Sequence, residues 1–360
     1  MRRINVAISS LTHAHVRKYY STLFTNPKIN WVAVSCEDEN ISNHFKTLGY
    51  NVPVYKTLDE MLKTHPEIDA VVCASDNSKH LEEFKTCCKY GKHILSMKIP
   101  SFDLDEYDRM IELVNRAGII CQVELELHYN PVVSRMMKLI QEGAVGEIVS
   151  FNATNITLSP VWAFPWQGKP ELSYGKKMKL KENDNRFRGG ALSDHPHIFD
   201  LVRWATSSEY RYVYAEAGHN IRTDLCEEDL VYVIGEMNNG TKFILDPSWS
   251  RLEERLKIPG PGWEVYPKRM EVNFVIIGTK GVLMADAFGP NVYFNGGPNN
   301  RYTVQYTYFD EWIGMMDEFY SCIVEGKQPK INLEWHRGTI EAMQNCYRSI
   351  LEEQPVFFGK

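Results

Sequence analysis

Short apolar runs alternate with helix-length segments through the first third of this sequence, and this alternation constrains the fold more than any other feature. The apolar runs that predict buried strands lie at 4–8, 31–35, 68–73, 93–96 and 119–123. The segments with helical spacing lie between them, at about 14–23, 42–48, 58–63, 79–89 and 104–117. Strands that alternate with helices of about ten residues are typical of βαβ units. We therefore predict a doubly wound parallel sheet, which binds ligands at the carboxyl ends of its strands.

The turn after the first strand is where such a sheet carries a dinucleotide fingerprint, Gly-x-Gly-x-x-Gly/Ala. The six candidate cofactor residues there are Ser9, Ser10, Leu11, Thr12, His13 and Ala14. Only Ala14 fits the pattern, and Leu11 stands where a glycine would let the backbone approach the pyrophosphate. The turn still lies between a strand and a helix N-terminus, where amide groups and the helix dipole attract phosphate. It therefore stays the candidate phosphate site.

Two acidic residues follow the second strand. Glu37 and Asp38 lie close to the acidic position that hydrogen-bonds the adenine ribose in dinucleotide-binding domains. No arginine or lysine stands beside them in the sequence to bind a 2′-phosphate, so we expect NAD rather than NADP. Acidic residues are also common in loops at strand ends, and that simpler interpretation stays open.

The segment 189–204 reads GGALSDHPHIFDLVRW and combines a polar cluster with a helical pattern. Apolar residues recur at i, i+3, i+4 and i+7 from Ile198, which predicts a helix with one buried face. Ser193 or Asp194 can cap this helix, and Pro196 suits its first turn. The positive end of the helix dipole disfavours imidazolium, so His197 is a candidate general base. The alternative is a simple cap followed by an ordinary polar histidine.

The same segment offers ligand types for a metal. Asp194, His195 and His197 have suitable donor atoms, but Pro196 and the start of the helix make convergence of all three difficult. We therefore expect no metal.

Composition excludes several classes of protein. A chain of 360 residues can build two domains with sizeable cores. The net charge of -6 and the lack of a dense Lys/Arg block argue against a nucleic-acid partner. No apolar run is long enough to span a bilayer, and the run behind Met1 is too short for a signal peptide. The 8 cysteines are scattered, which favours reduced thiols and a cytoplasmic location.

The later part of the chain changes to strands in succession. The strands are expected at 147–155, 212–217, 230–237, 241–249, 269–277 and 281–287, and the helices at 134–142, 309–325 and 334–353. This order indicates an open, mostly antiparallel sheet packed on helices. The fold class is thus an α/β domain at 1–125 followed by an α+β domain at 126–360.

A long polar segment at 156–188 carries Trp162 and Trp166. Long loops with aromatic side chains are often binding loops. Tryptophan faces suit the C–H faces of a sugar ring, but such residues equally well plug their own domain.

Five segments of the chain carry short motifs whose order and spacing are informative. They read ASDNSKH at 74–80, GKHILSMKI at 91–99, LHYNP at 127–131, EGAVGEI at 142–148, and the glycine-led segment at 189–204. In this order and spacing they resemble motifs of the glucose–fructose oxidoreductase and inositol dehydrogenase family, Gfo/Idh/MocA. Met97 replaces a family Glu and His128 a common Arg, and one residue is missing between Asp194 and His197.

The resemblance implies a Rossmann-type NAD domain and an NAD(P)-dependent oxidoreductase that acts on a sugar, glycoside or cyclic polyol. Lys98 falls on the catalytic lysine and would stabilise the alkoxide, His197 would accept the hydroxyl proton, and Asp194 would orient His197 or hold a neighbouring hydroxyl. The further cofactor contacts implied are Ser75, Asn77, His80 and Lys98. The substrate contacts implied are Lys98, Tyr129, Trp162, Trp166, Asp194 and His197. The second-domain sheet would pair subunits into a homodimer or homotetramer.

Two other functions use the same residues or the same fold. Some family members retain NAD and cleave a glycosidic bond through a transient keto intermediate. A member without catalysis could instead sense a nucleotide or sugar, as the glycine-poor first turn would allow. Retention of Lys98 and His197 argues against that last alternative.

Overall fold

The computed structural model describes residues 2–13, 15–157, 190–221, 228–250, 271–289, 291–297, 300–305 and 310–359. The chain forms two compact units, each described here by itself. The described residues of the first unit are 2–126 and 310–337, and the rest belong to the second. The candidate residues Ala14, Trp162 and Trp166 lie outside the described residues.

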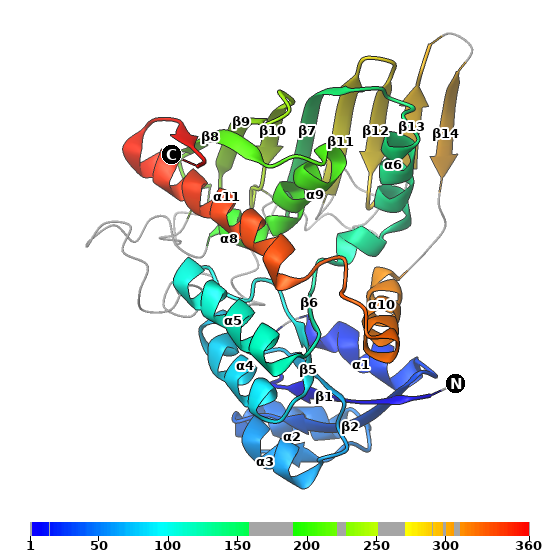
Figure 1. Cartoon of the computed structure of the whole chain (residues 1–360), viewed down its shortest axis with the longest axis vertical. Coiled ribbons are helices and arrows are strands. Elements are labelled where there is room, and N and C mark those ends of the chain that lie inside the picture. Colours follow the sequence, from blue (N-terminus) through cyan, green and yellow to red (C-terminus); the bar gives the residue numbers. More distant parts are fainter. Residues whose placement is uncertain are drawn as a thin grey trace, which may run out of the picture. The chain divides into compact units, whose positions relative to one another are not determined.

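The first unit is built on a six-stranded parallel sheet with the order β3-β2-β1-β4-β5-β6. Figure 1 labels its strands β1, β2, β5 and β6. Its strands are β1 (Ile4–Ser9), β2 (Ile29–Ser35), β3 (Val54–Tyr55), β4 (Ala70–Cys73), β5 (His93–Ser96) and β6 (Cys121–Val123). The order reverses between β1 and β4, which makes that edge the switch point where such sheets bind ligands. The predicted doubly wound sheet is confirmed, with β3 as the strand that the sequence did not reveal.

Helices connect these strands. They are α1 (Val16–Thr25), α2 (Glu39–Thr47), α3 (Leu58–Thr64), the short 3-10 helix η1 (Asn77–Lys79), α4 (His80–Lys89) and α5 (Leu104–Ala117). Local signals fix their ends. Asp103 accepts a hydrogen bond from the Glu106 amide at 3.0 Å to begin α5, and Gly118 ends it with a φ of 63°.

The helix α10 (Glu311–Glu325) belongs to the first unit, although the division at 125/126 assigns it to the second domain. The Gln122 side chain at β6 donates to the Met315 carbonyl at 3.1 Å. The Val123 amide donates to the Ile331 carbonyl at 2.9 Å. The chain therefore returns after the second unit to complete the first.

The second unit contains a nine-stranded sheet with the order β14-β13-β12-β11-β7-β10-β9-β8-β15 (Figure 1). The strands are β7 (Ile148–Ile156), β8 (Tyr210–Ala217), β9 (Val231–Met237), β10 (Lys242–Asp246), β11 (Glu271–Gly278), β12 (Val282–Asp286), β13 (Asn291–Asn295), β14 (Arg301–Gln305) and β15 (Val356–Phe357). Neighbouring strands are antiparallel except β10 and β7, which are parallel. The expected antiparallel sheet is confirmed; β13, β14 and β15 are additions to it.

Helices cover one face of this sheet. The helices of this part of the chain are η2 (Glu126–Tyr129), α6 (Pro131–Gln141), α8 (Ala191–Asp194), α9 (Pro196–Thr206) and α11 (Leu333–Glu352). The α6 helix contacts β12 and β13, and α9 contacts β7 and β10. Buried and exposed positions alternate along β9 and β10, as expected for a sheet with a single packed face. Within the described ranges, no helix is both long enough and apolar enough to cross a bilayer.

Candidate functional site

A cavity of about 740 Å³ lies at the carboxyl ends of β1, β2 and β4 in the first unit. The predicted cofactor residues that line it are Ser9, Ser10, Thr12, Glu37, Asp38 and Ser75. Parallel strands of a doubly wound sheet converge on this edge, so segments far apart in sequence meet in one pocket. The volume and the polar lining suit a nucleotide half of a dinucleotide.

The first turn closes without the glycines of the fingerprint. Ser10 adopts the left-handed conformation, with a φ of 70°, in which glycine is the usual residue. Its hydroxyl accepts a hydrogen bond from the Thr12 amide at 3.3 Å and lies 3.0 Å from the Thr12 hydroxyl. Leu11 is only 5% exposed and is not among the lining residues of the cavity. Leu11, at the second glycine position of the fingerprint, therefore packs away from the cavity and does not obstruct it.

Backbone amides of this turn already have partners. The Ser10 amide donates to the Ser35 carbonyl at 2.8 Å, and the His13 amide donates to the Ala74 carbonyl at 3.3 Å. These bonds fix the turn to the neighbouring strands. Hydroxyl groups of Ser10 and Thr12 are therefore the side-chain donors that the turn presents to a phosphate.

The two acidic residues at the end of β2 have different surroundings. Asp38 caps α2, and its Oδ1 accepts from the amides of Asn40 at 2.9 Å and Ile41 at 3.0 Å. Glu37 is exposed and its Oε2 lies 3.2 Å from Nζ of Lys79. We infer that Glu37 is the better placed of the two to bind ribose hydroxyls, because Asp38 already serves the helix.

The fold brings lysines to this acidic pair that the sequence does not place there. Lys79, from η1, and Lys56, which follows β3, both line the cavity. No lysine or arginine is next to Glu37 in the sequence, but folding brings Lys79 to it, so the expectation that no cation stands beside Glu37 is wrong. Spacing along the chain gave no signal of this, since Lys79 lies 42 residues beyond Glu37.

Asn77 and His80 lie behind the cavity rather than in its lining. The His80 ring is fully buried, and its Nδ1 lies 2.9 Å from the Pro100 carbonyl, to which it donates. Burial lowers the pKa of His80 to about 4, so the ring is neutral at physiological pH. His80 thus holds the segment that follows Lys98.

Lys98 lies half-buried two residues beyond β5. Burial lowers the pKa of His13, and the charges of His15 and Lys98 lower it further. Burial raises the pKa of Glu126 to about 7, with the Glu124 charge adding to the shift and Lys98 opposing it. The charge of Lys98 therefore acts on both His13 and Glu126.

Glu124 organises part of this cluster. It is fully buried; its Oε1 lies 2.6 Å from Nδ1 of His15, and its Oε2 accepts from the Tyr19 hydroxyl at 3.0 Å. The Trp312 ring contacts both His15 and Tyr19 edge to face, with centroids 5.3 and 5.2 Å away. Sequence reasoning missed Glu124 and Glu126. Their signal was available, because both follow an apolar strand at the carboxyl edge of the sheet.

In the second unit, α9 begins differently from the sequence prediction. Its N-cap is His195, without a side-chain capping bond, and neither Ser193 nor Asp194 caps it. The Ser193 hydroxyl donates to the Gly190 carbonyl at 2.9 Å. Asp194 Oδ2 accepts from Nε1 of Trp249 at 3.0 Å, and His195 Nδ1 donates to the Pro247 carbonyl at 3.0 Å. Asp194 and His195 therefore bond to residues distant in sequence, and Ser193 bonds to its own preceding turn, so none of the three caps α9.

The α9 helix is buried around almost its whole circumference rather than on one face. His197 lies in its first turn and is only 5% exposed. Asp200 is fully buried and hydrogen-bonds through Oδ2 to Nε2 of His128. The His128 ring stacks on Trp204, with centroids 4.3 Å apart. Asp200, His128 and Trp204 are thus held together by a hydrogen bond and a stacked ring pair.

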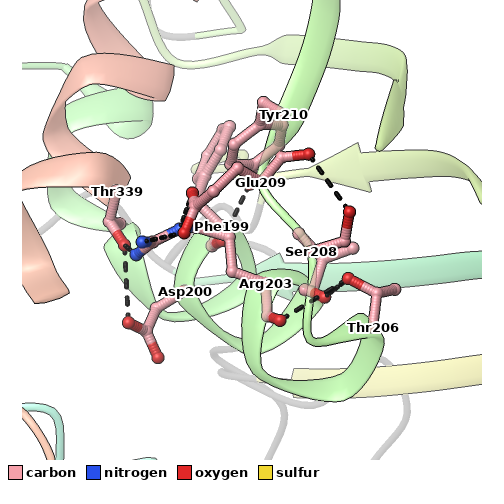
Figure 2. A network of polar contacts seen from close by, with 9 residues as sticks. Phe199, Asp200, Arg203, Thr206, Ser208, Glu209, Tyr210 and Thr339 are labelled. Atoms are coloured by element: carbon pink, nitrogen blue, oxygen red, sulfur yellow. Dashed lines mark hydrogen bonds and ion pairs between the residues drawn. The ribbon is translucent and has the colours of Figure 1, made fainter. Parts of the chain in front are cut away.

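Arg203 ties this helix to two neighbours (Figure 2). Its guanidinium makes two hydrogen bonds of 2.7 Å with the Glu209 carboxylate and a third, of 3.1 Å, to the Thr339 hydroxyl. The Thr339 hydroxyl donates in turn to Asp200 Oδ1 at 3.4 Å. These bonds fix the face of α9 that carries Asp200. Among the residues that the structure describes, no group of three or more His, Cys, Asp or Glu side chains is arranged to hold a metal ion.

Comparison with known proteins adds sequence and fold relationships. A family model described as "Oxidoreductase family, NAD-binding Rossmann fold" matches residues 12–125, and one described as "GFO/IDH/MocA C-terminal domain" matches residues 133–284. A myo-inositol 2-dehydrogenase from Thermotoga maritima is 23% identical over 290 residues, which cover 78% of this chain and 76% of that protein.

Two solved structures share the fold. An aldose-aldose oxidoreductase from Caulobacter crescentus, complexed with glycerol, has a TM-score of 0.80 at 17% identity, with coverage of 99% of this chain and 100% of that one. An oxidoreductase from Agrobacterium radiobacter in complex with NAD+, L-tartaric acid and magnesium has a TM-score of 0.79 at 13% identity, with coverage of 99% of both chains.

Proposed function

The chain belongs to the Gfo/Idh/MocA family of NAD-binding oxidoreductases, and we propose that it transfers a hydride between NAD and a secondary alcohol of a sugar, glycoside or cyclic polyol. The observation that carries this proposal is the cavity at the carboxyl ends of β1, β2 and β4. Hydroxyl groups at its first turn can donate to a phosphate, and an acidic side chain at the end of β2 stands where dinucleotide-binding domains bind the ribose. The residues present therefore fit NAD.

The nicotinamide, when bound, supplies the hydride acceptor. The chain's own residues supply the proton chemistry. His197 is buried in the first turn of α9, where the helix dipole favours the neutral ring, and we assign it the hydroxyl proton. Lys98 supplies the positive charge that stabilises a developing alkoxide. Asp194 receives the Trp249 hydrogen bond and holds either His197 or a neighbouring substrate hydroxyl.

The substrate class is proposed from Tyr129 and from the named activities of related proteins. Tyr129 is half-buried at the end of η2, and we retain it as a substrate contact together with Trp162 and Trp166. The named activities of related proteins, on inositol and on aldoses, favour a polyhydroxylated ring. A redox-cycling glycoside cleavage would use the same residues, and it differs by returning the hydride in each turnover.

The first experiment is a fluorescence titration of cofactor-free protein with NADH and NADPH. We expect micromolar binding of NADH and weaker binding of NADPH, followed by NAD reduction with members of a sugar and polyol panel. Failure to bind either dinucleotide would refute the proposal. Glycoside cleavage without net NADH formation would identify the redox-cycling reaction instead.

We also propose a homodimer or homotetramer that pairs through the open face of the second sheet. The apolar side chains exposed on its strands are Val149, Tyr232, Ile234, Ile244, Ile277 and Met284. Ile234 and Ile244 are cross-strand neighbours on β9 and β10. Contiguous apolar surface of this kind is typical of subunit interfaces.

Light scattering of the variants Ile234→Lys and Ile244→Lys tests this assembly. Each should lower the measured mass toward that of a monomer, whereas Phe24→Lys, at an exposed phenylalanine of the first unit, should leave it unchanged. A monomeric wild-type protein would contradict the proposed assembly.

A further inference from the structure

A buried carboxyl group joins the two segments that close the cofactor turn. Glu83 lies in the first turn of α4, is 8% exposed, and lines the cavity. The Ser9 hydroxyl hydrogen-bonds to its Oε1, and the Ser75 hydroxyl donates to its Oε2 at 2.7 Å. Ser9 occupies the first glycine position of the dinucleotide fingerprint, and Ser75 follows β4. One side chain therefore connects the ends of β1 and β4 at the switch point of the sheet.

The charge state of this carboxyl group is unusual. Burial raises the pKa of Glu83 to about 8, against the two serine hydrogen bonds and the Lys79 charge, which lower it; the Asp76 charge raises it. A protonated carboxyl accepts at one oxygen and donates at the other, so Glu83 can bond to both serines while neutral. At neutral pH the group is thus mostly an uncharged acid inside the wall of the cavity.

We propose that Glu83 is a positioning residue of the cofactor site, which as a neutral acid ties Ser9 to Ser75 and on ionisation weakens dinucleotide binding. This inference rests on the proposed binding of NAD at the first turn. Both serine hydroxyls donate to Glu83 in the structure, so a carboxylate can keep both bonds. Ionisation acts instead through the negative charge that it adds to a cavity that receives a diphosphate anion.

Other ionisable side chains also line the cavity and contribute to the charge that a bound dinucleotide meets. The charged side chains that line it are Glu37, Asp38, Lys56, Asp59, Asp76, Lys79 and Glu82. Cys36 also lines it, and burial raises the pKa of that thiol above its ordinary value of 9. Burial lowers the pKa of Lys79, but Glu37 raises it above its ordinary value, so Lys79 keeps its positive charge over the pH range of interest. Glu83 is therefore the group expected to change charge between about pH 7 and pH 9.

The test is the dissociation constant of NADH, measured by fluorescence at intervals from pH 6.5 to 9.5. For the wild-type protein we expect about tenfold weaker binding at the alkaline end, which corresponds to a shift of about one pKa unit in Glu83 on binding. Glu83→Gln keeps a neutral donor and acceptor and should bind NADH with little pH dependence. Glu112→Gln, an exposed α5 position outside the cavity, should keep the wild-type profile.

Further variants separate positioning from stability. Glu83→Leu removes both serine bonds and should weaken NADH binding at every pH, and circular dichroism verifies that it is folded. Ser75→Ala removes one bond and provides a second, milder perturbation that should also weaken binding. NADH binding that is independent of pH in the wild-type protein, or a Gln variant with the wild-type slope, would overturn the inference while leaving the proposed function intact. Absence of NADH binding at every pH would instead refute both.

Discussion

The ion pair of Arg203 and Glu209 offers a direct measure of how strongly α9 is held in place. Arg203 is 3% exposed and makes three hydrogen bonds, two to the Glu209 carboxylate and one to Thr339 (Figure 2). Close packing leaves no room for adjustment, since a Cβ at Gly338 would lie 2.6 Å from Nη2 of Arg203. The substitution Arg203→Met keeps an unbranched apolar stem and removes these three hydrogen bonds.

The loss of unfolding free energy in Arg203→Met depends on how buried the remaining Glu209 carboxylate is. Removing one member of a buried ion pair costs about 3–5 kcal/mol, because the remaining charge is left uncompensated. The Glu209 side chain is 57% exposed and regains water when the arginine is absent. The loss should therefore fall below that range, at about 1.5–3 kcal/mol in the free energy of unfolding, the value of hydrogen bonds to a charged group. Arg203→Lys keeps the charge but lacks the planar guanidinium, so its free energy of unfolding should lie between those of the wild-type protein and Arg203→Met.

Urea unfolding followed by circular dichroism measures this difference. The matched control is Arg211→Met, which breaks an Arg–Glu hydrogen bond of the same 2.7 Å length, between Arg211 and Glu236. The Arg211 side chain is 57% exposed, and the Glu236 carboxylate keeps its bond from Lys242 Nζ when Arg211 is removed, so the unfolding free energy should change far less. If the two methionine variants were equally stable, burial of Arg203 would not be the source of its strength.

Three further predictions concern the proposed site. Because burial raises the pKa of Glu83 from 4.5 to about 8, the fold loses stability as pH rises between these values, and Glu83→Gln should therefore stabilise the protein more at pH 8 than at pH 5 in urea unfolding. Glu37→Ala should weaken NADH binding about tenfold and raise the preference for NADPH, because Lys79 loses its 3.2 Å partner; unchanged affinity for both would exclude Glu37 from the ribose site. Lys98→Ala and His197→Ala should each lower kcat by about two to four orders of magnitude with NADH affinity largely kept, and near-normal turnover in either would remove it from the proposed mechanism.

Much of the first unit could be predicted because its signals are local. The helix at 104–117 was predicted with the same ends that the structure gives it. Asp103 and Gly118 set those ends through hydrogen bonds and a φ value that depend only on neighbouring residues. The apolar runs of β1, β4 and β5 likewise predict strands, because both faces of a parallel sheet are buried.

Packing overrode local signals at the start of α9. The sequence offered Ser193 and Asp194 as caps, which is the local preference of these residues. In the fold, Asp194 instead accepts from the Trp249 indole, and burial extends around the helix. A one-sided apolar pattern describes a helix on a surface, and it cannot anticipate a helix enclosed on all sides.

The sequence by itself determined the alternation of strands and helices, the edge where a ligand must bind, and the family motifs that single out Lys98 and His197. Only the tertiary structure decided what the glycine-poor turn does: Ser10 takes the glycine conformation, Leu11 packs inward, and Glu83 reaches Ser9 across 74 residues of chain. The reason is physical. Periodicity and capping are short-range properties of the backbone, whereas the charge and hydrogen bonding of a buried carboxyl depend on groups that only folding brings together.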